Sequence, residues 1–263
     1  MHDLEKPAAI FCVVRADEDG AVCLLQGEDG SRRWQHLSSL RVRESFLGEA
    51  QCGPEPVHLA RALGEVGFAV CDGFESSSEC HAIREALLGL QMVAGTTVAR
   101  NDIHSGRGDR VAFIEDETVT PVVRIFLERL DDIVMELQAL TPSLKALSLV
   151  RNAMASRYPA DGARYIRHID NPDRNGRKLT CIVYFNEGWA PEHGGCLRLH
   201  LRGDAGGLHA GPVDVPPTLG RLVIFPSETR QHEVLPSYHE RVALTCWYHD
   251  VEELQMHSPG LMA

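Results

Sequence analysis

Helical periodicity ends near the middle of this chain. Up to residue 148 the sequence contains three amphipathic stretches, and from there to the C-terminus short β-prone runs alternate with Gly, Pro and Asn turns. Helices followed by about eight strands are typical of an α+β domain in which a β-sandwich or barrel forms the core. We therefore expect the helices to support one face of a sheet.

Each helical stretch carries boundary signals. The first, VHLARALGEV from about residue 56, precedes the strand-like FAVCDGF. The second covers about 77–91, because Ser76 and Glu79 have the spacing of a capping box. The third begins with Pro121 and ends before Thr141-Pro142. Its apolar stripe is formed by Val123, Phe126, Leu127, Leu130, Ile133, Val134 and Leu137.

The N-terminal residues predict a separate small β-structure. The tripeptide EDG occurs at 18–20 and 28–30 between short β-prone runs, which favours a three-stranded meander over 8–37. This meander is interpreted either as an extension that packs on the main domain or as an independent SH3-like binding module. The stretch 44–56 lacks periodicity and is interpreted as a linker. We predict a β extension over 1–50 and a main domain over 51–263.

The amino-acid composition restricts which binding partners and which cellular compartment we expect. The 26 Lys and Arg residues against 37 Asp and Glu give a net charge of −11, which argues against a nucleic-acid or anionic-membrane partner. The eight cysteines form no C-x-x-C pair, and several lie in apolar runs, so we expect buried free thiols in a reducing compartment. Without an apolar leader or membrane span, a cytoplasmic or nuclear monomer is expected.

The segment YIRHIDNP, at 165–172, suggests a ligand site. A strand has a side-chain period of two, so His168 and Asp170 should share a face with Ile166. The later runs LTCIVYF and RVALTCWY each have one apolar face and one face of mixed chemistry. This pattern is expected when one sheet face packs on helices and the other lines a pocket.

A third candidate metal ligand and a nearby cation complete the predicted site. His232 in QHEVLP would give two histidines and one carboxylate with open coordination positions, the pattern of non-haem Fe(II) oxygenases. Arg241 follows on the mixed face of its strand, where a buried guanidinium needs an anion. A dicarboxylate cosubstrate would supply one, through chelation of iron at one end and pairing with Arg241 at the other. Alternatively, Arg241 reaches water at the strand end.

Several longer segments resemble a known family. YPADGARYIRHIDNPDRNGRKLTCIVYFNEGW, GGCLRL, HEVLP and RVALTCWYHD are similar to the catalytic domain of the oxygen-sensing prolyl hydroxylases that act on hypoxia-inducible factor. The resemblance covers about residues 56–250. It implies a double-stranded β-helix (jelly-roll) fold and hydroxylation of a protein proline at C4. It also implies Fe(II), 2-oxoglutarate, dioxygen, and ascorbate as reductant.

The resemblance also assigns roles to individual positions. It implies that His168, Asp170 and His232 are the iron ligands, and that Arg241, assisted by Tyr184, binds the distal carboxylate of 2-oxoglutarate. The cosubstrate pocket would include Tyr158 and Thr245, with Leu197 and Trp247 as apolar walls. SGRGDRVAFIED at 105–116 resembles a mobile loop that closes over the target peptide, with Arg107 and Asp109 in it; Arg177 resembles a substrate-contacting arginine.

The protein substrate is left open. The turn PSETRQHEV is about a residue shorter than in the animal enzymes and has Pro226 where they carry tryptophan. Relatives of the family also hydroxylate a ubiquitin-ligase adaptor and a translation elongation factor. The alternatives are an oxygenase of the same fold that acts on another protein residue, a nucleobase or a small molecule, and a catalytically silent binding module. The silent module predicts a broken triad.

Overall fold

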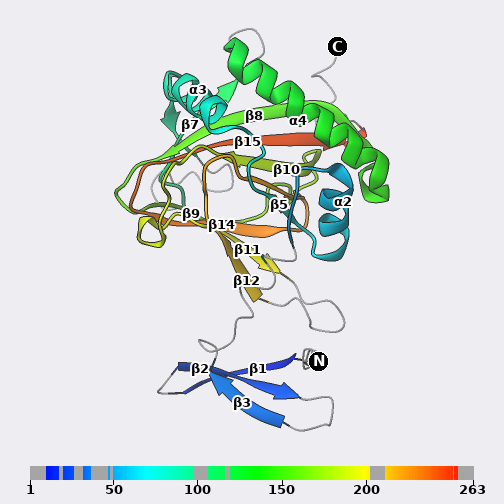
Figure 1. Cartoon of the computed structure of the whole chain (residues 1–263), viewed down its shortest axis with the longest axis vertical. Coiled ribbons are helices and arrows are strands. Elements are labelled where there is room, and N and C mark those ends of the chain that lie inside the picture. The colour runs from blue at the N-terminus through cyan, green and yellow to red at the C-terminus, as the bar shows by residue number, and fades with distance from the viewer. Residues whose placement is uncertain are drawn as a thin grey trace, which may run out of the picture.

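Two β-sheets face each other, and helices cover the outer face of the larger one (Figure 1). The computed structural model describes residues 10–17, 20–26, 32–36, 47, 50–96, 106–115, 119–201, 211–250 and 252–253. The helices are α2 (Pro56–Glu65), α3 (Ser77–Leu88) and α4 (Pro121–Leu140), and two short 3-10 helices span Pro142–Leu144 and Pro191–His193. None of the helices described is long and apolar enough to cross a membrane.

The larger sheet has eight strands and the smaller has four. In spatial order the larger contains β4 (Gln51–Cys52), β5 (Ala69–Cys71), β13 (Leu222–Pro226), β10 (Arg177–Tyr184), β15 (Arg241–Asp250), β8 (Leu147–Tyr158), β7 (Arg110–Ile114) and β6 (Val93–Ala94). The smaller contains β12 (Gly211–Val215), β11 (Leu197–Leu201), β14 (Gln231–Ser237) and β9 (Ala163–His168). Only β4 and β5 pair in parallel among the described strands. The double-stranded β-helix prediction is confirmed, with eight strands, β8–β15, in the described part after the last long helix.

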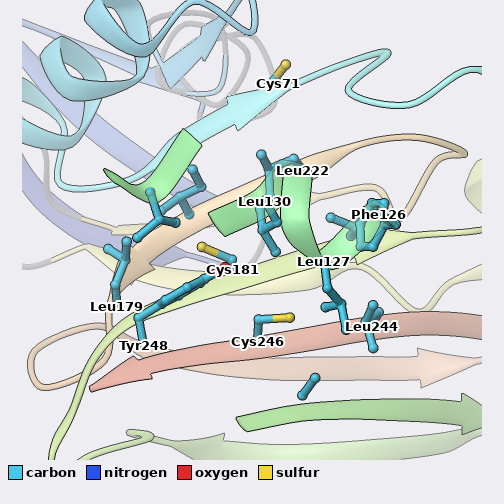
Figure 2. Close-up of a cluster of buried hydrophobic side chains, with 14 of the residues drawn as sticks. Cys71, Phe126, Leu127, Leu130, Leu179, Cys181, Leu222, Leu244, Cys246 and Tyr248 are labelled. Atoms are coloured by element: carbon cyan, nitrogen blue, oxygen red, sulfur yellow. The ribbon is translucent and has the colours of Figure 1, made fainter. Parts of the chain in front are cut away.

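The predicted two-faced strands divide the core as expected. One face of β10 and β15 packs under α4 (Figure 2), and its members are Leu179, Cys181, Val183, Val242, Leu244, Cys246 and Tyr248. The opposite face of β10 meets the smaller sheet, where Ile182 and Tyr184 pack with Leu197 and Leu199. Because the side-chain period of a strand is two, one strand serves both the helical layer and the space between the sheets.

The helix predictions hold with small boundary changes. The Glu79 amide N–H donates to the Ser76 hydroxyl, which confirms the capping signal at the start of α3. This helix ends at Leu88 rather than near residue 91, because the Gly89 N–H closes the last turn on the Glu85 carbonyl. Pro121 occupies the first turn of α4 as predicted.

The N-terminal strands form a sheet of their own. β1 (Ile10–Asp17), β2 (Gly20–Gln26) and β3 (Arg32–His36) pair antiparallel in sequence order, which confirms the predicted meander. The second EDG tripeptide and most of the first lie outside the described residues, and the division at residue 50 stays a prediction. Within the expected linker, Gln51 and Cys52 instead form β4, because β5 offers a free edge for parallel pairing.

The segment expected to be a mobile loop is partly a strand. Residues 110–114 form β7, which pairs with Ala153–Arg157 of β8, so the loop prediction for 105–116 is wrong over this stretch. The outermost residues, 105 and 116, lie outside the described part of the chain. The ladder to β8 fixes the backbone that follows Asp109.

Leu127 tests the packing of α4 on the sheet. Its side chain is 0% exposed, so Leu127→Ala should leave a cavity and lower the free energy of unfolding by about 2–5 kcal/mol. Denaturant unfolding followed by circular dichroism measures the change. The exposed Ile125 on the same helix is the matched control, and Ile125→Ala should change stability by less than about 0.5 kcal/mol. Equal effects of the two substitutions would contradict this packing.

Candidate metal centre and its surroundings

The pairing of β9 with β14 brings two predicted ligands together. His168 and His232 are Cα partners in this ladder, and their ring centroids are 4.2 Å apart. Asp170 follows two residues after the end of β9, and its Oδ1 lies 3.6 Å from His168 Nε2 and 3.8 Å from His232 Nε2. One ligand atom from each residue lies within 4.8 Å of the others. The three predicted ligands therefore converge.

The route to this convergence differs from the predicted one. Asp170 lies beyond β9 rather than on its face, and Ile166 is 41% exposed. Asp170 is held instead by the turn that follows it, where Asn175 Nδ2 donates to the Asp170 carbonyl at 3.1 Å. The prediction that Ile166, His168 and Asp170 share one strand face is thus wrong in detail, because β9 ends at His168, before the carboxylate.

Both imidazoles are oriented by backbone carbonyls. His168 Nδ1 lies 2.8 Å from the Ile166 oxygen, and His232 Nδ1 lies 3.1 Å from the Arg230 oxygen. A carbonyl can only accept, so each Nδ1 carries a hydrogen, and Nε2 is the ring atom that faces Asp170. Burial lowers the pKa of His232 to about 4, which keeps this imidazole neutral. With Nδ1 directed at a backbone carbonyl, each imidazole presents Nε2 as the atom for a metal ion.

Asp170 is fixed by a chain of hydroxyl groups. Thr180 Oγ1 donates to Asp170 Oδ2 at 2.8 Å, and the Ser227 hydroxyl lies 2.7 Å from Thr180 Oγ1. Burial alone would raise the pKa of Asp170, but His232 and His168 hold it well below its usual range. The carboxylate is therefore anionic, with Oδ2 engaged and Oδ1 facing the imidazoles. The sequence placed Thr180 on the mixed face of its strand but gave no signal for this role.

Arg241 is a buried cation at the start of β15. The residue is 2% exposed, its guanidinium carbon lies 4.8 Å from the Tyr158 ring centroid and 4.9 Å from that of Tyr184, and its Nε donates to the Gly195 carbonyl at 2.9 Å. No carboxylate forms an ion pair with it in the part of the chain that the structure describes. The alternative in which Arg241 reaches water is wrong, because neighbouring side chains enclose the strand start.

Other predicted pocket residues surround this cation. Tyr184 is fully buried, and its hydroxyl has no hydrogen-bond partner among the residues that the structure describes. Burial raises the pKa of Tyr184 to about 12, so it remains a hydroxyl donor. Leu197 packs in the same cluster as Tyr184, while Thr245 and Trp247 follow Arg241 along the same face of β15. The Trp247 indole N–H is also buried and has no hydrogen-bond partner in the described part of the chain.

The predicted substrate residues lie beside aromatic rings. Arg177 places its guanidinium carbon 4.1 Å from the Trp247 ring centroid. Arg107 lies 4.6 Å from the Tyr165 ring centroid and pairs with Asp109 through two hydrogen bonds of 2.6 and 2.9 Å. The sequence gave no role to Tyr165, which stacks on His168 with ring centroids 3.8 Å apart.

Known proteins share this arrangement of sequence and fold. A model of the 2OG-Fe(II) oxygenase superfamily matches residues 153–249. Human Egl nine homolog 1 is 36% identical over 208 residues, which are 74% of this chain and 47% of that protein. Mouse prolyl hydroxylase EGLN3 is 34% identical over 207 residues, covering 74% of this chain and 84% of that protein. The chain belongs to the EGLN-type prolyl hydroxylases of the 2OG-Fe(II) oxygenase superfamily.

Solved structures place this prolyl hydroxylase family member in the same fold. A Trichoplax adhaerens prolyl hydroxylase in complex with a hypoxia-inducible factor peptide fragment superposes with a TM-score of 0.67 at 27% identity, covering 84% of this chain and 97% of that one. A Pseudomonas putida prolyl-4-hydroxylase gives a TM-score of 0.63 at 27% identity, covering 74% and 98%. The chain spans about half the length of human Egl nine homolog 1.

The hydroxyl chain gives a prediction about metal affinity. Thr180→Val keeps the shape of the side chain but removes the donor to Asp170, so the affinity of the metal-free prolyl hydroxylase for Co(II) should fall about 10- to 100-fold. Isothermal titration calorimetry measures this affinity. Thr141→Val is the matched control, because the Thr141 hydroxyl is buried without a partner. Unchanged Co(II) affinity in Thr180→Val would contradict the role of the chain.

Proposed function

We propose that this chain hydroxylates a prolyl residue of a protein substrate at C4, with Fe(II), 2-oxoglutarate and dioxygen. The observation that carries the proposal is the combination of a His-Asp-His cluster with a buried cation that has no acidic partner among the described residues. The His-Asp-His cluster suits a divalent metal, and the buried cation requires an anion. A dicarboxylate that chelates the metal satisfies both.

His168, Asp170 and His232 are the residues that would hold Fe(II). Their donor set of two imidazole nitrogens and one carboxylate oxygen fits this ion and leaves coordination positions for other ligands. When bound, Fe(II) supplies the activation of dioxygen, coupled to oxidative decarboxylation of 2-oxoglutarate to succinate and carbon dioxide. Ascorbate would keep the metal reduced. The chain itself contributes ligand orientation, through the carbonyl and hydroxyl contacts of these three side chains.

Arg241 and Tyr184 would bind the distal carboxylate of 2-oxoglutarate. The Tyr184 hydroxyl has no partner among the described residues, and the Tyr184 ring lies beside the buried Arg241 guanidinium, where a charge-assisted hydrogen bond to a carboxylate is strong. Tyr158 packs on the same guanidinium and holds it in position. Thr245, Leu197 and Trp247 would complete the polar and apolar walls of the cosubstrate pocket. These contacts orient the keto acid toward the metal and exclude water.

The substrate peptide would enter between the two arginine-aromatic stacks. Arg177 on Trp247 and the pair of Arg107 with Asp109 are the residues we assign to this side, in accord with the family pattern. The Trichoplax relative is described in complex with a hypoxia-inducible factor peptide, which supports a protein substrate and a role in oxygen sensing. We place the activity in the cytoplasm and the protein as a monomer.

The rival functions have less support. A catalytically silent binding module predicts a broken triad, whereas all three ligands and Arg241 are present. An oxygenase that acts on nucleobases would be expected to carry positive charge for the phosphates, and the net charge of −11 argues against it.

Peptide hydroxylation tests the proposal directly. The purified protein is incubated with Fe(II), 2-oxoglutarate, ascorbate and proline-containing peptides, and a 16 Da gain on proline should accompany equimolar succinate. The same peptides with alanine in place of proline should gain nothing, and the His232→Ala protein should produce neither product. A gain on another residue, or on none of the peptides while succinate forms, would contradict prolyl hydroxylation.

Arg241→Ala isolates the cosubstrate contact. A buried carboxylate that loses its charged partner costs about 2–5 kcal/mol, so the KM for 2-oxoglutarate should rise by at least about 30-fold. Steady-state kinetics with varied 2-oxoglutarate measures the change. Arg198→Ala is the control, because Arg198 lies on β11 and pairs with Asp214. An unchanged KM in Arg241→Ala would remove Arg241 from the site.

A further inference from the structure

We propose that Tyr165 is a positioning residue for His168, and that Arg107 holds Tyr165 in place. The segment 106–109 would then act on the metal centre itself, in addition to any contact with substrate. This inference rests on the proposed function only in taking His168 as a metal ligand.

Segment 106–108 is attached to the edge of β9. The Gly108 N–H donates to the Arg164 carbonyl, and the Ile166 N–H donates to the Gly106 carbonyl, both at 2.8 Å. Arg107 and Tyr165 form an antiparallel bridge between these bonds. β9 therefore has β14 on one side and this segment on the other. The side chains of Arg107 and Tyr165 are placed together by backbone pairing.

Tyr165 is enclosed on both faces of its ring. One face stacks on the His168 imidazole with ring planes 20° apart, and the Arg107 guanidinium lies over the ring as described above. Rotation of the imidazole about its Cβ–Cγ bond would drive its edge into the Tyr165 ring. Together with the hydrogen bond to the Ile166 carbonyl, the stack therefore fixes the direction of His168 Nε2.

Arg107 is itself held rigidly. It pairs with Asp109, whose side chain is 0% exposed, and its Nη2 lies 3.5 Å from Met154 Sδ. The backbone at Gly95 closes over this pair, and a Cβ there would lie 2.5 Å from both Arg107 Nε and an Asp109 oxygen. A bidentate ion pair in such a place costs little further entropy to order. The guanidinium thus forms a fixed lid on Tyr165.

These contacts give Arg107 a positioning role in addition to any contact with substrate. The two charges neutralise each other, and the enclosed Asp109 carboxylate offers no exposed oxygen to a peptide. Both faces of Tyr165 are already covered. The backbone pairing of segment 106–108 with β9 therefore fixes Arg107 over the Tyr165 ring, and the Tyr165 ring in turn fixes the His168 imidazole.

Co(II) binding to the metal-free protein tests the inference without catalysis. Tyr165→Leu removes the stack, and we expect its Co(II) affinity to fall about tenfold or more, with a changed visible absorption band of the bound ion. Tyr165→Phe keeps the stacked ring and should restore wild-type affinity and spectrum. Tyr238→Leu, at an exposed position, is the control and should behave as the unaltered protein.

A second variant covers the case in which Tyr165→Leu does not fold. The double substitution Arg107→Met with Asp109→Asn removes the lid without leaving a buried charge, and it should also lower Co(II) affinity. Wild-type affinity and spectrum in either folded variant, with only the peptide KM raised, would overturn the positioning role. Failure of the unaltered protein to bind Co(II) would instead overturn the metal site of the proposed function.

Discussion

The register between β9 and β14 is the constraint on which the site depends. It opposes His168 to His232 across an antiparallel ladder and so joins two distant parts of the chain at one point. Because side chains alternate along a strand, a slip of one residue would turn His232 to the other face and abolish the cluster. The turn after β9 then brings Asp170 close to the two histidines, and hydrogen bonds from Asn175 and Thr180 hold it there. Metal binding is in this sense a property of strand pairing.

Charge balance links this cluster to the interior of the larger sheet. Asp170 is an enclosed anion beside the His168 and His232 imidazoles, and Arg241 is an enclosed cation whose neighbours are neutral tyrosines. Each is costly by itself, because charges out of water need partners. With a divalent metal and a dicarboxylate in place, the formal charges of these four components cancel. The ligand-free protein therefore buries one anion and one cation without full charge compensation, and this favours binding of the metal and the dicarboxylate together.

The parts of this arrangement that depend on local periodicity could be predicted from the sequence. The alternating faces of 179–185 and 241–248 and the stripe of α4 follow from strand and helix geometry. The parts that the sequence did not reveal depend on tertiary contacts. Thr180 bonds Asp170 only because β10 lies beside the turn, and 110–114 is a strand only because β8 offers an edge. The depth of Arg241 likewise follows from what surrounds the strand start.

The two arginine-aromatic stacks beside the cluster differ in what they leave available. Arg107 is neutralised by Asp109 and is committed to the Tyr165 ring, so little of its hydrogen-bonding capacity remains. Arg177 lies on Trp247 without an ion pair in the described residues, and burial lowers its pKa. A cation of this kind gains from a hydrogen-bond acceptor brought by another molecule, whereas Arg107 gains nothing. The two arginines therefore differ in hydrogen-bonding capacity: Arg177 can still donate to a partner from another molecule, whereas Arg107 is already engaged with Asp109 and the Tyr165 ring beside His168.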